Sequence, residues 1–136
     1  MILPLTLLAS ATGARTWIGI AAVSRRPATK AAAVSELIYD KVPRVPPRVA
    51  PVSLLGRVAA GAIVGLIVGA RTGRSRVGSA LAGGVIAFVG AHVTYRMRRA
   101  LGTRMPATAA ALLEDGIVIG AAAIGAARLR ADVRKG

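Results

Sequence analysis

The sequence predicts an all-α fold: an integral membrane bundle of about four transmembrane helices with a central Gly-rich antiparallel helical hairpin. Hydrophobic residues make up 54% of the 136 residues, charged residues 18% and aromatic residues 3%, and the mean hydropathy is +0.60. Soluble domains normally carry about 25% charged residues. Small apolar residues such as Ala and Gly fill a soluble core poorly but suit helices that pack closely in a bilayer. The whole chain, 1–136, is expected to be a single transmembrane domain.

The predicted apolar helices cover residues 2–23, 54–70, 79–95 and 107–127. A spanning helix needs about 20 residues, in a range of about 17–25, and each stretch falls in that range. The first stretch is interrupted by Arg15. Its apolar start and small residues also resemble a signal peptide, but it lacks the positively charged n-region. Because apolar residues resume after Arg15 in "TWIGIAAV", a retained, interrupted membrane segment is favoured over a cleaved leader.

The connection between the first two stretches has two parts. In "KAAAVSELIYDKV" the larger apolar residues share one side of a helix, and Glu36 and Asp40 lie four residues apart on another side, which predicts a short helix. The following connector, 41–53, is rich in proline and is expected to be extended, because proline at this density is incompatible with a helix. Four charged residues in and before this connector form a candidate connector site: Glu36, Asp40, Lys41 and Arg48.

Glycine recurs at every fourth position through the second stretch, and small residues recur at the same spacing in the third. This spacing places them on one face of a helix, where a partner backbone approaches closely, as in a glycine zipper. Only residues 71–78 separate the two stretches, so they are expected to form an antiparallel hairpin. Gly116 and Gly120 repeat the pattern more weakly in the last stretch. The predicted helix-packing residues are Gly61, Gly65, Gly69, Gly73, Gly83 and Ala87.

The formal net charge is +14, with 19 basic and 5 acidic residues, and the basic residues flank each apolar run. This distribution favours contact with a lipid bilayer and its anionic headgroups, and disfavours nucleic acid as a partner. Segments 24–53 and 96–106 carry more basic residues than 71–78 and 128–136, which favours termini outside the cell. Four short helices with many small residues bury little volume, which favours a homo-oligomer.

Four charged residues fall inside the apolar stretches, where each charge is costly. Arg57 lies one turn into its helix and is expected to snorkel to the interface. Arg15 is expected to pair with Asp115 or Glu114 in the bundle interior, because pairing offsets the desolvation of both ions. Adjacent helical residues point about 100° apart, so only one of the two acids is expected to face Arg15.

The sequence contains no recognisable catalytic constellation, and no cofactor or metal is expected. His92 is the single histidine and is interpreted as a packing or headgroup-contacting residue. Three classes of function remain open: a structural or accessory membrane protein, a small-solute permeability factor using the buried Arg–acid pair, and a membrane-surface enzyme. The enzyme alternative requires converging acids such as Glu36, Asp40 and Glu114.

Several stretches resemble domain-of-unknown-function family 4126, a group of small bacterial integral membrane proteins with glycine-zipper-like helices. The matching stretches are "ATGARTWIGI", "SELIYDKVPRVPPRVAP", "LLGRVAAGAIVG", "YRMRRAL" and "LLEDGIVIGAAA", so the resemblance covers nearly the whole chain. The resemblance implies a multi-pass protein of the bacterial inner membrane. It implies no activity, substrate or cofactor.

Overall fold

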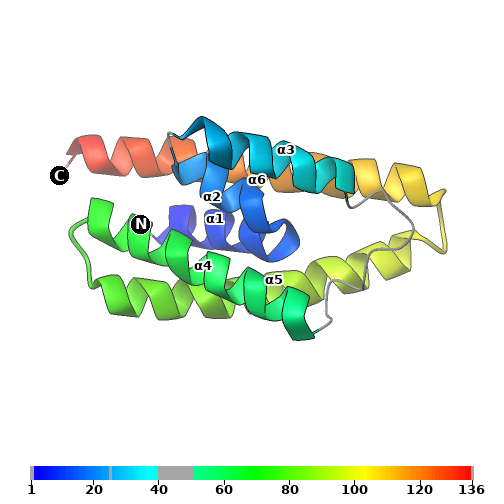
Figure 1. Cartoon of the computed structure of the whole chain (residues 1–136), viewed down its shortest axis with the longest axis horizontal. Helices are drawn as coiled ribbons and strands as arrows, with labels where there is room; N and C mark the ends of the chain where they lie inside the picture. Colours follow the sequence, from blue (N-terminus) through cyan, green and yellow to red (C-terminus); the bar gives the residue numbers. More distant parts are fainter. Residues whose placement is uncertain (1, 25, 40–50, 136) are drawn as a thin grey trace.

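The computed structural model is all-helical and describes residues 2–24, 26–39 and 51–135 (Figure 1). Within these ranges the helices are α1 (Ile2–Ala14), α2 (Thr16–Val23), α3 (Pro27–Tyr39), α4 (Pro51–Arg71), α5 (Arg76–Leu101) and α6 (Ala107–Lys135). Three of them, α4, α5 and α6, contain segments long and apolar enough to cross a membrane: Pro51–Arg71, Arg76–Leu101 and Thr108–Arg134.

The first apolar stretch does not form one long helix. Arg15 has an extended backbone, with φ −140° and ψ 113°, and divides the stretch into α1 of 13 residues and α2 of 8 residues. Neither helix reaches the length of about 17 residues that a crossing requires. The chain then turns back, so that Gly19 of α2 packs on Thr12 and Leu8 of α1. Residues 2–23 are therefore a short helical hairpin with its tip at Arg15.

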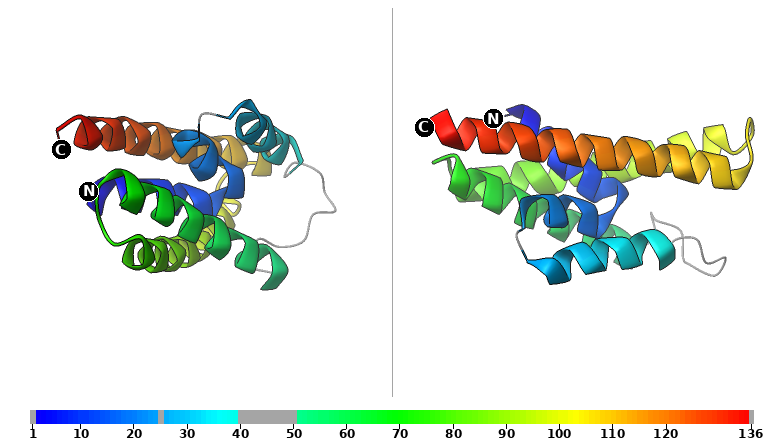
Figure 2. Two further views of the ribbon diagram at one scale, coloured as in Figure 1. Left: turned by 60° about the vertical axis from the view of Figure 1, so that its left-hand side comes forward. Right: turned by 90° about the horizontal axis from the view of Figure 1, so that it is seen from above.

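The hairpin tip lies inside a bundle formed by the longer helices. Figures 1 and 2 show α1 running between α6 and the α4–α5 pair, and α1 packs on all three of these helices. Both chain termini lie at one end of the molecule, here called the terminal end, and the α5–α6 turn lies at the opposite or distal end. An apolar cluster joins the hairpin to its neighbours; it includes Leu5, Leu8, Val23, Val64, Val68 and Leu129.

Glycines allow α4 and α5 to approach closely. A Cβ atom added to Gly61 would lie 2.6 Å from the carbonyl oxygen of Gly83, and one added to Gly69 would lie 2.7 Å from the Ser79 hydroxyl. Gly65 lies against the backbone of Ser79 in the same way. Ala87 is fully buried and meets Gly61. The small residues on these faces therefore set the distance between the two backbones.

Other glycines differ from the predicted packing pattern. Gly73 lies in the turn after α4 with φ +66° and open space around it, so it is a turn residue and not a packing residue. Its conformation is the left-handed one that glycine adopts at little cost. Gly116 and Gly120 also face open space, whereas Gly125 packs on Leu8, with 2.9 Å between its added Cβ and Leu8 Cγ.

The long helices extend beyond their predicted bounds. Helix α4 begins at Pro51, in agreement with the preference of proline for the first helical turn, so residues 51–53 of the expected connector are helical. Helix α5 begins at Arg76 because the Ser75 hydroxyl accepts a hydrogen bond of 3.2 Å from the Gly78 N–H. Helix α6 continues through the basic residues after 127. The remaining connector residues, 41–50, lie outside the described part of the chain.

Candidate functional site

Arg15 occupies the tip of the α1–α2 hairpin and points into the bundle. Its backbone N–H donates to the carbonyl of Ala11 at 2.8 Å and completes α1, while its extended conformation starts α2. Its side chain is 1% exposed and contacts the carboxylate of Asp115 on α6, which is 7% exposed. The structure thus brings together two ions that are 100 residues apart in the sequence.

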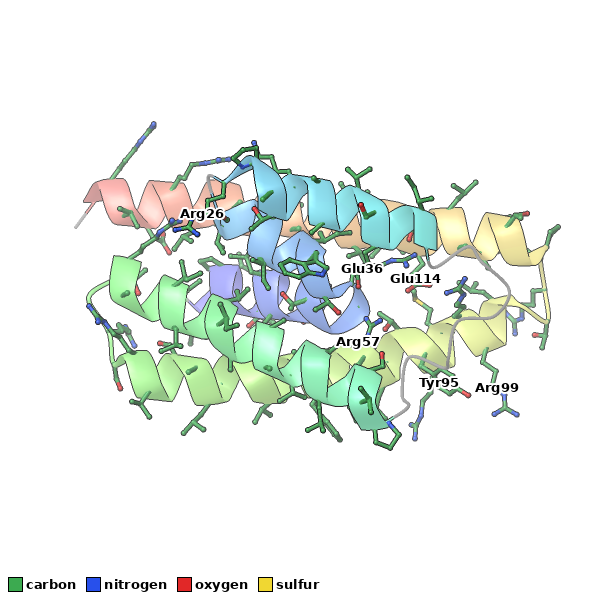
Figure 3. The ribbon with its side chains drawn as sticks, viewed as in Figure 1. Arg26, Glu36, Arg57, Tyr95, Arg99 and Glu114 are labelled. Carbon is green, nitrogen blue, oxygen red and sulfur yellow. The ribbon has the colours of Figure 1, made fainter. Side chains whose placement is uncertain are left out.

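The two adjacent acids of α6 face different partners. Glu114 is fully buried, and its Oε2 lies 3.8 Å from Nη1 of Arg98 on α5. The Arg98 side chain is 35% exposed, so this pair reaches from the interior to the surface. Figure 3 shows Glu114 directed into the space between α6 and the distal part of α5. The divergence follows from the angle of about 100° between neighbouring side chains on a helix.

Arg57 is buried, contrary to the expectation that it snorkels to the interface. It is 4% exposed, and its guanidinium donates to the carbonyl of Gly13 at 3.0 Å and to that of Ala14. These carbonyls end α1 and have no partner within their own helix. A cation at this position also interacts favourably with the negative C-terminal end of the helix dipole. The bend at Arg15 therefore creates the acceptors that hold Arg57 inside.

Glu36 binds the other helix end that the bend exposes. Its carboxylate accepts hydrogen bonds from the N–H groups of Thr16, at 2.7 Å, and Trp17, at 2.8 Å. These groups open α2, where donors lack helical partners and a negative charge is favourable. Glu36 thus caps α2 from α3, a role that its predicted place in a connector site did not indicate. Asp40, Lys41 and Arg48 of that predicted site lie outside the described residues.

The charged residues around the hairpin tip form one group, here called the tip network. It consists of Arg15, Glu36, Arg57, Arg98, Glu114 and Asp115, contributed by the bend and by α3, α4, α5 and α6. The cations and carboxylates balance in formal charge. Burying helix ends without partners is costly. Here both ends that meet at the bend have ionic partners, which allows a broken helix inside the bundle.

Close backbone packing holds the tip in place. A Cβ atom added to Gly13 would lie 2.9 Å from the carbonyl carbon of Ala87 on α5, and Gly19 meets the buried Thr12 hydroxyl. Gly13, Gly19 and Arg98 were not predicted from the sequence to have these roles. The run "TGARTWIG" could have indicated a role for Gly13 and Gly19, because it places one glycine on each side of the charged residue Arg15.

The remaining polar candidates have local roles. The Nδ1 of His92 is hydrogen-bonded to the Phe88 carbonyl at 2.9 Å, and the two rings are 4.5 Å apart between centroids. His92 therefore packs within its own helix. Among the described residues, no group of three or more His, Cys, Asp and Glu side chains is placed to hold a metal ion.

No protein-family model, curated protein or solved structure matches the chain.

Proposed function

We propose that the chain is a multi-pass protein of the bacterial inner membrane, related to family 4126, in which α4, α5 and α6 cross the bilayer. The length and apolar character of these three helices support this placement. The close glycine contacts between α4 and α5 support our proposal of a central Gly-rich hairpin of the glycine-zipper kind. The α1–α2 hairpin enters from the terminal end and returns to it. Irregular backbone of this kind is tolerated at membrane depth when protein surrounds it.

The distribution of basic residues supports an orientation with both termini in the cytoplasm. Both termini lie on one side because the chain passes to the distal end between Ser24 and Pro51, along α3, which adds a fourth pass to those of α4, α5 and α6 (Figure 1). The described basic residues at the terminal end include Arg26, Lys30, Arg71, Arg74, Arg76, Arg128, Arg130 and Arg134; those at the distal end are Arg96, Arg98, Arg99 and Arg104. Basic residues concentrate on the cytoplasmic side of bacterial membrane proteins. This proposal reverses the orientation favoured by the sequence, because α3 begins at the terminal end and brings Lys30 beside Arg71 and Arg130.

The function that the site supports best is that of a small-solute permeability factor whose tip network lines a polar path. The carrying observation is that two ion pairs, Arg98–Glu114 and Arg15–Asp115, start from neighbouring residues of α6, and that the Arg98 side chain is 35% exposed whereas Glu114 is fully buried. Ionisable residues at membrane depth are functional-site candidates by default. Broken helices whose ends meet charged groups are typical of solute sites in transporters.

The path is closed toward the terminal end in the conformation described here. Beyond Arg15, the hairpin packs through Leu5 and Leu8 against Val64, Val68 and Leu129. An apolar plug of this kind excludes hydrated solutes. Passage therefore requires the α1–α2 hairpin to move relative to α4 and α6, and a change in the Arg15–Asp115 pair is the natural trigger for such a movement.

A structural or accessory role is the second candidate, and a specific observation favours it. Both helix ends at the bend are already bound by side chains of the same chain, Arg57 and Glu36. A network built only to lock the fold would have this property. Association into a homo-oligomer through the exposed apolar faces belongs to this alternative. A surface enzyme has less support, because Glu36 caps α2 and Glu114 faces Arg98 instead of sharing a pocket.

Flux measurements on proteoliposomes separate these candidates. We expect the wild-type protein to raise the permeability of vesicles to small ions or polar solutes above that of protein-free vesicles. Asp115→Asn should change this flux because it neutralises the partner of Arg15. Asp132→Asn is the matched control on the same helix, outside the tip network, and should retain wild-type flux.

Wild-type vesicles that are no more permeable than protein-free vesicles would exclude a permeability function for the solutes tested. Equal flux from wild type and Asp115→Asn, with both proteins folded by circular dichroism, would remove the tip network from the path. Either result would leave the structural role as the better account.

A further inference from the structure

A second polar site lies at the terminal end, away from the tip network. A cavity of about 440 Å³ opens between α2, α3, α4 and α6. Ser24, Lys30, Arg71 and Arg130 contribute its polar lining, and Ala22 and Leu129 are among the residues of its apolar lining. This volume falls within the range of about 300–1,000 Å³ that is usual for small-molecule sites.

The charges of this cavity come from separate parts of the chain. Lys30 lies in α3, Arg71 is the last residue of α4, and Arg130 lies near the end of α6. The fold thus collects three cationic side chains around one opening, although they are distant in sequence. The described residues that line the cavity include no carboxylate. Like charges held together in this way favour an anion between them.

We propose that this cavity binds a phosphate group, supplied by the headgroup of an anionic phospholipid. Arginine is suited to phosphate because its planar guanidinium donates two parallel hydrogen bonds, and lysine adds a point charge. The mixture of a cationic rim and apolar lining matches a phosphate attached to a glycerol backbone and acyl chains. Basic pockets between membrane helices are a known mode of headgroup recognition.

The position of the cavity agrees with a lipid as the source. Arg71 and Arg130 lie at the ends of the segments that are long enough to cross a membrane, Pro51–Arg71 and Thr108–Arg134. In the orientation proposed above, this end faces the cytoplasmic leaflet. The phosphate site depends only on the cavity and its charges. It therefore does not require the tip network to conduct a solute, and the two proposals fail independently.

Native mass spectrometry of the purified protein in detergent provides the test. We expect the protein to retain phosphatidylglycerol in preference to phosphatidylcholine. The double variant Arg71→Gln/Arg130→Gln should bind phosphatidylglycerol about 30-fold more weakly, as estimated for the loss of two interfacial cations. The matched control, Arg74→Gln/Arg134→Gln, removes the same net charge at the same end from residues that do not line the cavity, and should bind within about twofold of wild type.

Two further measurements complete the test. Thermal unfolding of the lipid-free variants checks that each is folded, and Lys30→Gln, a single change at the cavity, should weaken binding even if the double variant is unstable. Inorganic phosphate distinguishes the source. Stabilisation of wild type by phosphate alone, with no preference for phosphatidylglycerol, would retain the phosphate site but assign it to a free anion. Equal losses in the cavity and control variants, or no effect of either ligand, would overturn the proposal.

Discussion

The loss of stability on changing the Arg15–Asp115 pair should depend on whether one ion or both are removed. Replacing Asp115 with Leu leaves the guanidinium of Arg15, 1% exposed, in the interior without its carboxylate. Breaking a buried pair in this way costs about 3–5 kcal/mol. A direct estimate agrees, because two unit charges about 4 Å apart interact by about 4 kcal/mol at an effective dielectric constant of 20. Such a loss lowers the folding equilibrium constant by about 1,000-fold.

Removing both ions has the opposite consequence. In Arg15→Met/Asp115→Leu neither ion of this pair remains to be desolvated, so the double variant should be more stable than either single variant and within about 1 kcal/mol of wild type. The free energy of unfolding in mixed detergent micelles, followed by circular dichroism and by fluorescence of the single tryptophan, Trp17, measures all four proteins. Asp132→Leu is the control and should lose less than about 1 kcal/mol. Additive losses in the double variant would refute an interior ion pair.

Three further predictions concern packing, capping and orientation. Gly65→Ala should destabilise the protein by about 1–3 kcal/mol, because its Cβ would lie 2.7 Å from the Ser79 carbonyl carbon. Gly120→Ala faces open space and should be neutral or stabilising in the same unfolding assay. Equal effects of the two changes would contradict the role of Gly65 in packing. Glu36→Ala should lower the free energy of unfolding by about 0.5–2 kcal/mol, because α2 loses the acceptor for its first N–H groups. An unchanged free energy of unfolding would contradict this capping role. A cysteine at Arg74 should react with an impermeant thiol reagent from the cytoplasmic side and a cysteine at Arg104 from the opposite side; the reverse pattern would place the termini outside.

The helical class and the long apolar helices were predictable because they depend on local composition. Runs of small apolar residues about 20 residues long specify helices suited to a bilayer. Glycine at every fourth position predicted where α4 and α5 approach, because that spacing repeats along one helix face. Gly73 departed from this pattern because α4 ends at Arg71, and the end of a helix is set by local turn geometry.

The bend at Arg15 was not predictable from local sequence. Nothing in "SATGARTWIG" forbids a continuous helix, since it contains no proline and only two glycines. The bend depends on contacts with residues far along the chain: Ala87 beside Gly13, Asp115 beside Arg15 and Glu36 at the start of α2. The position of Arg57 follows from the bend, because its carbonyl acceptors exist only where α1 ends. Tertiary partners therefore determined the part of the site that sequence patterns missed.

The α1–α2 hairpin is the feature on which the whole account depends, and the sidedness of its two ends tests it most directly. The chain has no natural cysteine, so single cysteines at Leu3, Ser24 and Thr103 are unambiguous probes in sealed membrane vesicles. We expect an impermeant thiol reagent to label the cysteines at Leu3 and Ser24 from the same side, and the cysteine at Thr103 from the other. Labelling of Leu3 and Ser24 from opposite sides would show that residues 2–23 cross the membrane, and would contradict the buried tip at Arg15.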